Sequence, residues 1–423
     1  MKSLWLRNVT TLVAFTLAMA GIVDTSWAQC PDGCGASVVG SYPSALASHF
    51  GGGGPGGLLG DSFSAGDSIQ GGPGGPFLSG AGGWGGGGTG YQLGGSCCGP
   101  HWYDFAIQSV FLQRDGGDSM GIISLGIPGV GPPDIVQSTG SPDFNFEAGI
   151  RVAGSFQTSA LHSIEAIYLG GLDWDDRVVV TNGEDNLFSV FSNFGNDPFG
   201  GFEDSDQASI SSLTYDSELD SVELNFRRAL PPVSDRMHTS VLWGFRYLRI
   251  DESLNQRIDV LAHFDDINMV PRGNEFTEYD IAVTNDLFGL QAGGESLICL
   301  SPGIQFGAEG KFGVYGNNAD LDSSLTSTTL TDTLIENDRD GTVSFVSDAN
   351  IFLLWQFHPM FKFRTGYEVI FFQGIGTAAS NYDPSARSIA DGDPLLTAGR
   401  IIDVDNNDNA FFHGFHFALE FGW

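Results

Sequence analysis

The sequence has few basic residues, few cysteines and, after its N-terminus, no long apolar run. Its 423 residues include 18 Lys and Arg against 51 Asp and Glu, which gives a formal net charge of −33. Because the phosphates of nucleic acids would be repelled by so acidic a chain, binding to nucleic acid is excluded. No later segment has the 18 or so consecutive apolar residues of a spanning helix. If the chain enters a membrane, it must do so as a closed β-barrel, which also satisfies every backbone polar group.

The five cysteines give little reason to expect a metal or redox site. Cys30, Cys34, Cys97 and Cys98 lie near the N-terminus, and Cys299 stands apart from them. The Cys30–Cys34 spacing has no second matched pair, which a zinc site of this kind would need. Local disulfides or free thiols are the simpler interpretation in an exported chain, and we expect no cofactor.

The N-terminus predicts export from the cytoplasm. Lys2 and Arg7 flank the start of an apolar core at 11–20, and the small residue Ala28 follows it. This order is typical of a secretory signal peptide, and the core is too short to span a membrane as a helix. We therefore interpret residues 1–28 as a cleaved signal peptide.

Glycine dominates the next segment. Residues 29–100 contain runs such as Gly51–Gly54 and Gly85–Gly88. Such a segment cannot bury enough apolar surface to offset the loss of backbone entropy. We interpret 29–100 as a low-complexity periplasmic segment and 101–423 as the folded domain.

The folded domain alternates apolar and polar residues with a period of two. Phe144, Phe146 and Ile150 share one face of a strand, and Glu147 and Arg151 share the other. A tilted transmembrane strand needs about 9–11 residues, a length that ten segments reach. These segments are 102–114, 144–156, 160–170, 213–228, 237–250, 276–292, 304–314, 342–357, 361–371 and 410–423.

The last segment carries an apolar face that a soluble protein would rarely leave at its end. In an outer-membrane barrel, such a face meets lipid and its closing aromatic residue lies at the interface. We therefore expect contact with outer-membrane lipid and recognition by the barrel-assembly machinery. The residues of this assembly signal are Phe415, Phe417, Leu419, Phe421 and Trp423.

The connections between these segments alternate in length. Short links are expected at 158–159, 229–236, 293–302 and 358–359, and long ones at 115–143, 171–212, 251–275, 315–341 and 372–409. Short periplasmic turns and long, here acidic, external loops produce this asymmetry. The sequence thus predicts an all-β, closed antiparallel barrel of about ten strands in the bacterial outer membrane. A soluble β-sandwich is the alternative. Residues 187–191 and 258–264 could extend strands or add a pair.

The inward face of the predicted strands carries charges of both signs. An eight-stranded barrel is filled by side chains, so ten strands should leave a narrow lumen. Opposite charges there would pair, either as a structural plug or as the lining of a narrow ion path. The predicted lumen charges are Glu147, Arg151, Glu165, Glu223, Arg227, Arg246, Glu309, Lys311, Arg364 and Glu368.

Candidate catalytic and metal sites are weak. Asp175 and Asp176 could serve a barrel protease, but the chain has no His-Asp dipeptide. His162, His413 and His416 have no evident serine partner, so we expect no enzyme. In the acidic segments, Asp403, Asp405 and Asp408 are weak calcium candidates, without EF-hand spacing.

Several segments resemble the bacterial beta-barrel porin-7 family, and together they cover roughly residues 100–423. They are Glu147-Ala148-Gly149-Ile150-Arg151 and the segments 163–168, 215–219, 244–248 and 285–293. The resemblance implies an outer-membrane barrel and a porin, and it supplies no substrate and no catalytic residues.

The preferred function is a narrow channel for small solutes or cations, or a structural barrel. A surface platform for binding or adhesion is the second hypothesis, and an outer-membrane hydrolase is the third.

Overall fold

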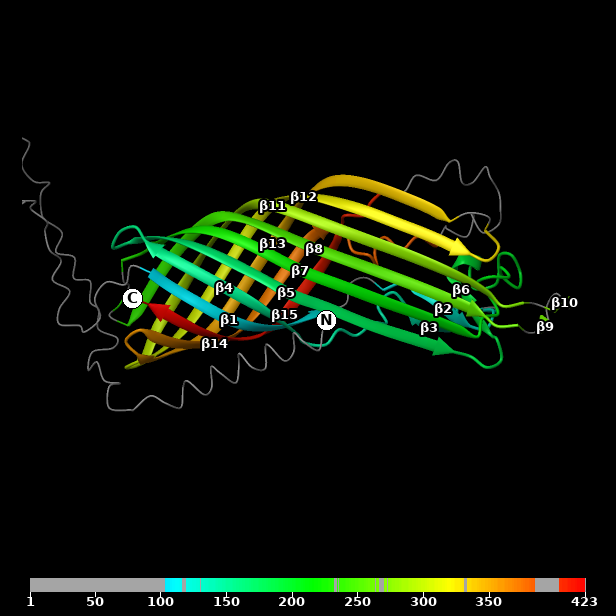
Figure 1. The fold of residues 1–423 in the computed structure, drawn as a ribbon, viewed down its shortest axis with the longest axis horizontal. Helices are drawn as coiled ribbons and strands as arrows, with labels where there is room; N and C mark the ends of the chain where they lie inside the picture. The colour runs from blue at the N-terminus through cyan, green and yellow to red at the C-terminus, as the bar shows by residue number, and fades with distance from the viewer. Residues whose placement is uncertain are drawn as a thin grey trace, which may run out of the picture. The chain divides into compact units, whose positions relative to one another are not determined.

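The computed structural model describes residues 103–115, 119–129, 131–231, 234, 236–262, 264–265, 270–271, 273–330, 333–384 and 403–422. Within these residues, ten antiparallel strands close into a barrel (Figure 1), which confirms the predicted fold class. The strands are β1 (Tyr103–Asp115), β4 (Glu147–Gln157), β5 (His162–Thr181), β7 (Ile210–Ala229), β8 (Met237–Val260), β11 (Glu275–Ser301), β12 (Ile304–Ser327), β13 (Leu334–His358), β14 (Phe361–Ile375) and β15 (Asp408–Gly422).

Some sequence-based predictions fall outside the described residues. They are the signal peptide at 1–28, the glycine-rich segment at 29–100, the four cysteines Cys30, Cys34, Cys97 and Cys98, and the terminal Trp423.

Each strand pairs with its neighbours in chain order, and the two ends of the sheet meet. β1 pairs with β4 on one side and with β15 on the other. The seam between the first and last strands runs from Asp104↔Gly422 to Asp115↔Phe411. The closed part of the sheet leaves no unpaired strand edge, the requirement that hydrocarbon surroundings impose. Beyond this part, β5 after residue 170 and β13 before residue 345 each pair with a strand on one side only. No helix among the described residues has the length and apolar character of a membrane span.

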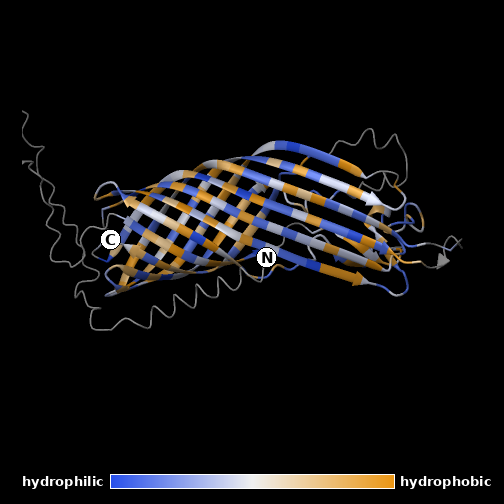
Figure 2. Ribbon diagram, viewed as in Figure 1, coloured by the Kyte–Doolittle hydropathy of each residue, from blue (hydrophilic) through white to orange (hydrophobic). Residues whose placement is uncertain are grey.

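Several strands are far longer than a membrane requires. β8 and β12 each have 24 residues and β11 has 27, roughly twice the expected length. The expectation of loops at 171–181, 251–260 and 315–327 is therefore wrong, because these residues continue β5, β8 and β12. The period-two alternation persists through them, as the alternating colours along the strands of Figure 2 show.

The alternation persists, but the polarity of its two faces reverses part way along the strand. On β8, Trp243 and Phe245 face outward and are 47% and 54% exposed. Further along the same face come Arg249 and Asp251, which form an ion pair. The opposite face becomes largely apolar at this level and buries Leu248, Ile250 and Leu254, with Glu252 and Gln256 at the intervening buried positions. An apolar exterior thus gives way to a polar exterior around an apolar core.

The same reversal occurs at matching levels on three more strands. Asp220 on β7, Asp286 on β11 and Asn318 on β12 are the first polar outward residues beyond the apolar exterior. We name the part with the apolar exterior the membrane half and the part beyond it the outer half. The membrane half carries the short turns, the end that faces the periplasm in barrels of this type.

Short elements fill the outer half. β2 (Gly121–Leu125), β3 (Ile135–Ser138) and β6 (Leu187–Ser189) form a three-stranded sheet, and the 3₁₀ turn η2 (Val190–Ser192) follows β6. Ile122, Ile123 and Phe191 from these elements join the buried core of the long strands.

The segments 187–191 and 258–264, which could extend strands or add a pair, belong to different elements. Leu187–Ser189 belongs to the separate sheet, whereas Ile258 lies within β8. The pair β9 (Phe264–Asp265) and β10 (Val270–Pro271) forms a two-stranded sheet at the tip of the β8–β11 connection.

The C-terminal strand carries the expected aromatic exterior. Phe415 and Phe417 are 37% and 44% exposed, and Phe111 on β1 stacks on Phe415 with a centroid separation of 5.0 Å. These rings form part of the apolar surface of the membrane half.

Candidate functional site in the barrel interior

The interior of the membrane half is packed with paired charges. Arg246 lies 2.6 Å from Asp348 and 3.5 Å from Glu223, and Lys311 lies 3.0 Å from Glu223. These groups come from β7, β8, β12 and β13, so the pairs cross the lumen as well as linking neighbouring strands. The Arg246 side chain is 2% exposed and that of Glu223 is 5% exposed. Little water therefore reaches this level of the barrel.

Amide side chains donate the remaining hydrogen bonds to Glu223. Asn225 donates a hydrogen bond to its carboxylate at 3.0 Å, and Gln291 donates another at 2.8 Å. A buried carboxylate is tolerated only when such partners replace its hydration. Glu223 is thus the centre of a satisfied network and is not a free charge facing a pore.

A second cluster lies closer to the short-turn end. Arg227 contacts Glu165 at 3.0 Å, Glu295 at 3.2 Å and Glu309 at 3.0 Å. Its side chain is 18% exposed, so this level is closer to solvent than Arg246. One guanidinium with five donors can serve three carboxylates, which a lysine could not do with the same geometry.

Two further pairs extend the network around the wall. Arg151 binds Glu368 through two hydrogen bonds of 2.8 and 2.9 Å, a bidentate arrangement that fixes orientation as well as charge. Arg364 lies 2.5 Å from Glu420, and its guanidinium covers the ring of Phe352 at 4.0 Å.

The structure places nine predicted lumen charges in these clusters, and the tenth, Glu147, lies on the same face of β4 as Arg151. Sequence reasoning omitted several partners whose strand parity is the same and would have identified them. These are Gln108, Asn225, Gln291, Glu295, Asp348, His416 and Glu420.

One buried ion pair lies within the outer half. Arg114 contacts Glu252 at 2.6 Å, and the Tyr215 hydroxyl donates to the same carboxylate at 2.5 Å. The rings of Phe144 and Tyr215 lie 5.2 and 5.1 Å from the guanidinium carbon. The Ala378 amide also donates to Glu252, at 3.1 Å. This cluster therefore ties the segment after β14 to the barrel wall.

The segment between η2 and β7 folds around a second buried carboxylate. Asp206 accepts hydrogen bonds from the amides of Ser189 and Phe202 at 2.7 and 2.8 Å, and from the hydroxyls of Ser192 and Ser205. Burial nevertheless raises the pKa of Asp206 to about 6, although the four hydrogen bonds act in the opposite direction. The group holds its loop in place through these hydrogen bonds.

The catalytic candidates are not brought together. Asp176 accepts the Asp143 amide at 2.8 Å in the outer half. His162 lies at the opposite end, where its Nδ1 is 2.9 Å from Ser159 Oγ, which corrects the expectation that it lacks a serine partner. His413 contacts the Tyr367 hydroxyl at 2.6 Å on the exterior.

The remaining candidates for chemistry are equally dispersed. His416 lies inside the barrel, 3.0 Å from Asn350 Oδ1. Asp175 is on β5 beside Asp176. A protease or lipase site needs a base, its orienting group and a nucleophile within hydrogen-bonding reach of one another.

Two of the calcium candidates accept hydrogen bonds, and the third is exposed. Asp405 accepts the Asn407 amide at 3.0 Å, Asp408 accepts the Thr377 hydroxyl, and Asp403 is exposed. No group of three or more His, Cys, Asp or Glu among the described residues could hold a metal ion.

The chain is similar to several solved structures of low sequence identity. The outer membrane protease OmpT from Escherichia coli shares 12% identity, with a TM-score of 0.42 and coverage of 78% of this chain and 99% of that one. The toluene transporter TodX from P. putida shares 9% identity, with a TM-score of 0.23 and coverage of 77% and 90%. No curated protein sequence matches the chain.

Membership of a family rests on the sequence. The model of the family described as "Putative beta barrel porin-7" matches residues 207–423, just over half of the chain, from the start of β7 to the C-terminus. This match confirms the resemblance found in the sequence and agrees with the closed ten-stranded barrel. The chain belongs to the beta barrel porin-7 family of outer-membrane barrels.

Proposed function

We propose that the protein is a structural barrel, sealed along its axis, that holds an acidic β-structure above the outer membrane. The observation that carries this proposal is the dry ion network around Glu223, whose side chain is 5% exposed. Glu223 contacts Arg246 on the neighbouring strand and Lys311 from across the lumen. An aqueous pore would hydrate these groups. Ten strands also give a narrow bore that side chains can fill.

The outer half supports the same conclusion. Its interior is largely apolar and includes fully buried Trp174, Phe412 and Ile250 around the buried Arg114–Glu252 pair. Solutes that passed the ion network would still have to cross this core. Water-filled lumens have polar walls, whereas this wall is packed like the interior of a soluble protein. The two layers form successive barriers.

Single-channel recording in a planar bilayer tests the proposal. We expect the folded protein to give no conductance steps at salt concentrations where an open porin, inserted under the same conditions, gives regular ones. Insertion is checked by protease protection and by heat-dependent migration on gels. Reproducible steps that increase with salt concentration would refute the sealed barrel and restore the narrow channel.

A surface-binding role is the second candidate. A polar concavity of about 760 Å³ lies on the exterior of the outer half, between β8 and β13. Arg249, Arg339 and four aspartates line it, so it offers donors and acceptors to a polar ligand. Binding of labelled polysaccharides to whole cells, lost on replacing Asp322 and Asp338 with Ala, would support this role. Equal binding by the variant would remove it.

Export and assembly complete the proposal. Residues 1–28 would be removed in the periplasm, and the C-terminal strand would be recognised by the assembly machinery. N-terminal sequencing of the mature protein should begin at Gln29. A chain that retains Met1 in the outer membrane would contradict the first part.

A further inference from the structure

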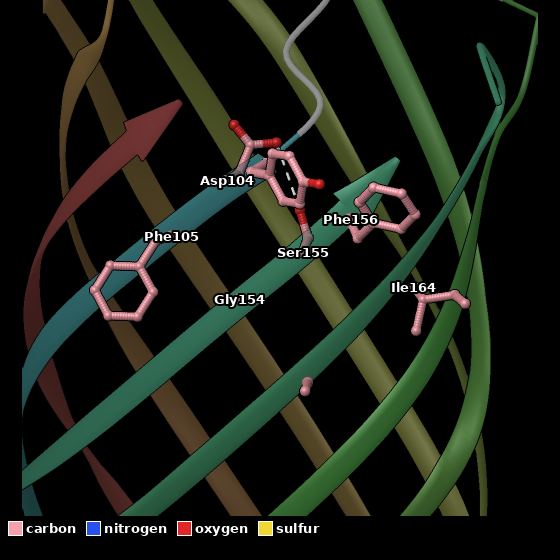
Figure 3. A pocket seen from close by; sticks show the side chains of 8 residues that line it. Asp104, Phe105, Gly154, Ser155, Phe156 and Ile164 are labelled. Atoms are coloured by element: carbon pink, nitrogen blue, oxygen red, sulfur yellow. Dashed lines mark hydrogen bonds between the residues drawn. The ribbon is translucent and has the colours of Figure 1, made fainter. Parts of the chain in front are cut away.

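A groove crosses the lipid-facing surface of the membrane half near its short-turn end (Figure 3). Its volume is about 410 Å³, and its lining is apolar apart from Asp104 and Ser155, which are hydrogen-bonded to each other. Phe105 on β1, Phe156 on β4 and Ile164 on β5 border it. The groove lies on the exterior of the barrel and is separate from the ion network.

Small residues form the floor of the groove. Phe105 pairs with Gly154 on β4, and Gly154 pairs with Ala166 on β5, so two small residues lie side by side. The neighbouring register brings Phe156 beside Ile164, and both are more than 40% exposed. A strip without side-chain bulk between larger apolar side chains fits an extended hydrocarbon chain.

A basic residue lies at the rim beside this groove. Arg228 on β7 pairs with His162 on β5, two residues beyond Ile164 toward the short-turn end. It faces the exterior, because Val222 and Leu224 on the same face of β7 are 51% and 53% exposed. The two residues that separate His162 from Ile164 correspond to about 7 Å along the strand.

No carboxylate neutralises Arg228 among the described residues. Its neighbour Arg227 points inward and engages three glutamates, whereas no ion pair is formed by Arg228. The next acidic residue on the outward face of β7 is Asp220, eight residues away, or about 26 Å along the strand. In a chain with a net charge of −33, this leaves a positive charge available at the interface.

We propose that this surface binds one phospholipid of the periplasmic leaflet, with its phosphate on Arg228 and an acyl chain in the groove. Guanidinium groups bind phosphate oxygens through charge-assisted hydrogen bonds, and His162 is positioned to add a donor. A second copy of this chain is a poorer occupant. Two-fold pairing through this surface would bring equal positive charges, the two Arg228 side chains, toward each other.

Two variants separate the two parts of the site. Gly154→Leu fills the floor, and no heavy atom lies within 4 Å of the position that its Cβ would take, so the fold should tolerate it. Arg228→Gln removes the charge at the rim. Gly310→Leu is the matched control, because Gly310 also lies on the lipid face and its nearest contact would be 3.9 Å.

The test measures phospholipid retained by the full-length mature protein after detergent exchange. Phosphatidylglycerol and phosphatidylethanolamine are added at a fixed ratio, and bound lipid is counted by native mass spectrometry. We expect about one retained lipid in the wild type and in Gly310→Leu. Arg228→Gln should bind roughly tenfold more weakly, as expected for loss of a charge-assisted hydrogen bond, and Gly154→Leu should retain none.

The outcomes are distinguishable. Equal retention by all four proteins would mean non-specific annular lipid and would overturn the proposal. A wild type without lipid that migrates as a dimer, and becomes monomeric in Gly154→Leu, would assign the groove to a second copy and also overturn it. Circular dichroism and heat-dependent migration confirm that each variant is folded. The result is independent of conductance, so it does not depend on whether the barrel is sealed.

Discussion

Replacing Glu223 with Gln should destabilise the barrel by about 3 kcal/mol, the lower end of the 3–5 kcal/mol cost of removing one partner of a buried ion pair. The substitution keeps the size of the side chain and removes the charge that faces Lys311 at 3.0 Å. Arg246 keeps Asp348 at 2.6 Å, so only the lysine loses its principal partner. This is the reason for choosing the lower value.

The assay is equilibrium unfolding by guanidinium chloride in lipid vesicles at pH 7, followed by tryptophan fluorescence. Glu203→Gln is the control, because Glu203 is exposed in the 193–209 connection and should change stability by less than about 0.5 kcal/mol. The double variant Glu223→Leu/Lys311→Met removes both charges and should be more stable than Glu223→Gln. A loss below about 1 kcal/mol for Glu223→Gln would mean that water solvates the network, because hydrated ion pairs contribute about that little.

Three further results are expected. Leu254→Asn, on the interior of the outer half, should cost about 3 kcal/mol or more, whereas Ser253→Asn on the exterior of the same strand should be nearly neutral. The 193–209 connection should become less stable as pH rises from about 4 to about 6, because Asp206 has a folded pKa of about 6 and an ordinary pKa of 3.8. Hydrogen exchange should show a loss of about 3 kcal/mol in the opening free energy over this range, and Asp206→Asn should not show it. The pKa of Glu218 is raised by burial and by the nearby carboxylates of Asp173, Asp251, Asp220 and Asp216. Glu218→Gln should therefore stabilise the protein by a few tenths of a kcal/mol in low salt, and this gain should disappear in 1 M salt.

Each of these expectations has a contrary outcome. Similar costs at residues 253 and 254 would mean that the two faces of β8 do not differ in the outer half. If the stability of the 193–209 connection still fell with pH in Asp206→Asn, the pH dependence would belong to another group. The direction for Asp206 follows from its raised pKa, since the folded state then holds a proton that the unfolded state has released. A Glu218→Gln gain that is unchanged by salt would point to packing and not to charge crowding.

The sequence predicted the barrel because hydrocarbon permits few architectures. Ten alternating segments, their lengths and the apolar C-terminal face led to the closed sheet that the structure has. The inward charges were also recognisable, since the alternation of Ile150 and Arg151 assigns each side of β4. The prediction that Phe144 shares the outward face is wrong, because Phe144 precedes β4 and is buried against Arg114 and Tyr215. These features depend on local spacing, which one sequence contains.

The outer half could not be predicted by the same reasoning. Residues 251–260 keep the alternation of β8, but their outward positions are the polar Asp251 and Ser253, whereas the outward positions eight residues earlier are Trp243 and Phe245. Because an outward membrane-facing strand should be apolar, these polar residues led to the prediction of a loop at 251–260. The partners of Glu223 were missed in part for another reason, because contacts across the lumen with Lys311 or Gln291 depend on strand tilt and stagger. Those quantities come from closure of the whole sheet.

The level at which the strands exchange an oily surface for a polar one fixes how deeply the molecule sits in the bilayer. Sinking by two residues would carry Asp220 and Asp286 into hydrocarbon, and rising by as much would lift Phe245 and Phe288 into water. Tilting the barrel would bury acidic residues in hydrocarbon on one side and expose apolar residues to water on the other. The barrel is therefore held upright at a fixed depth in the bilayer. The tip of the outer half stays at a constant distance from the lipid surface.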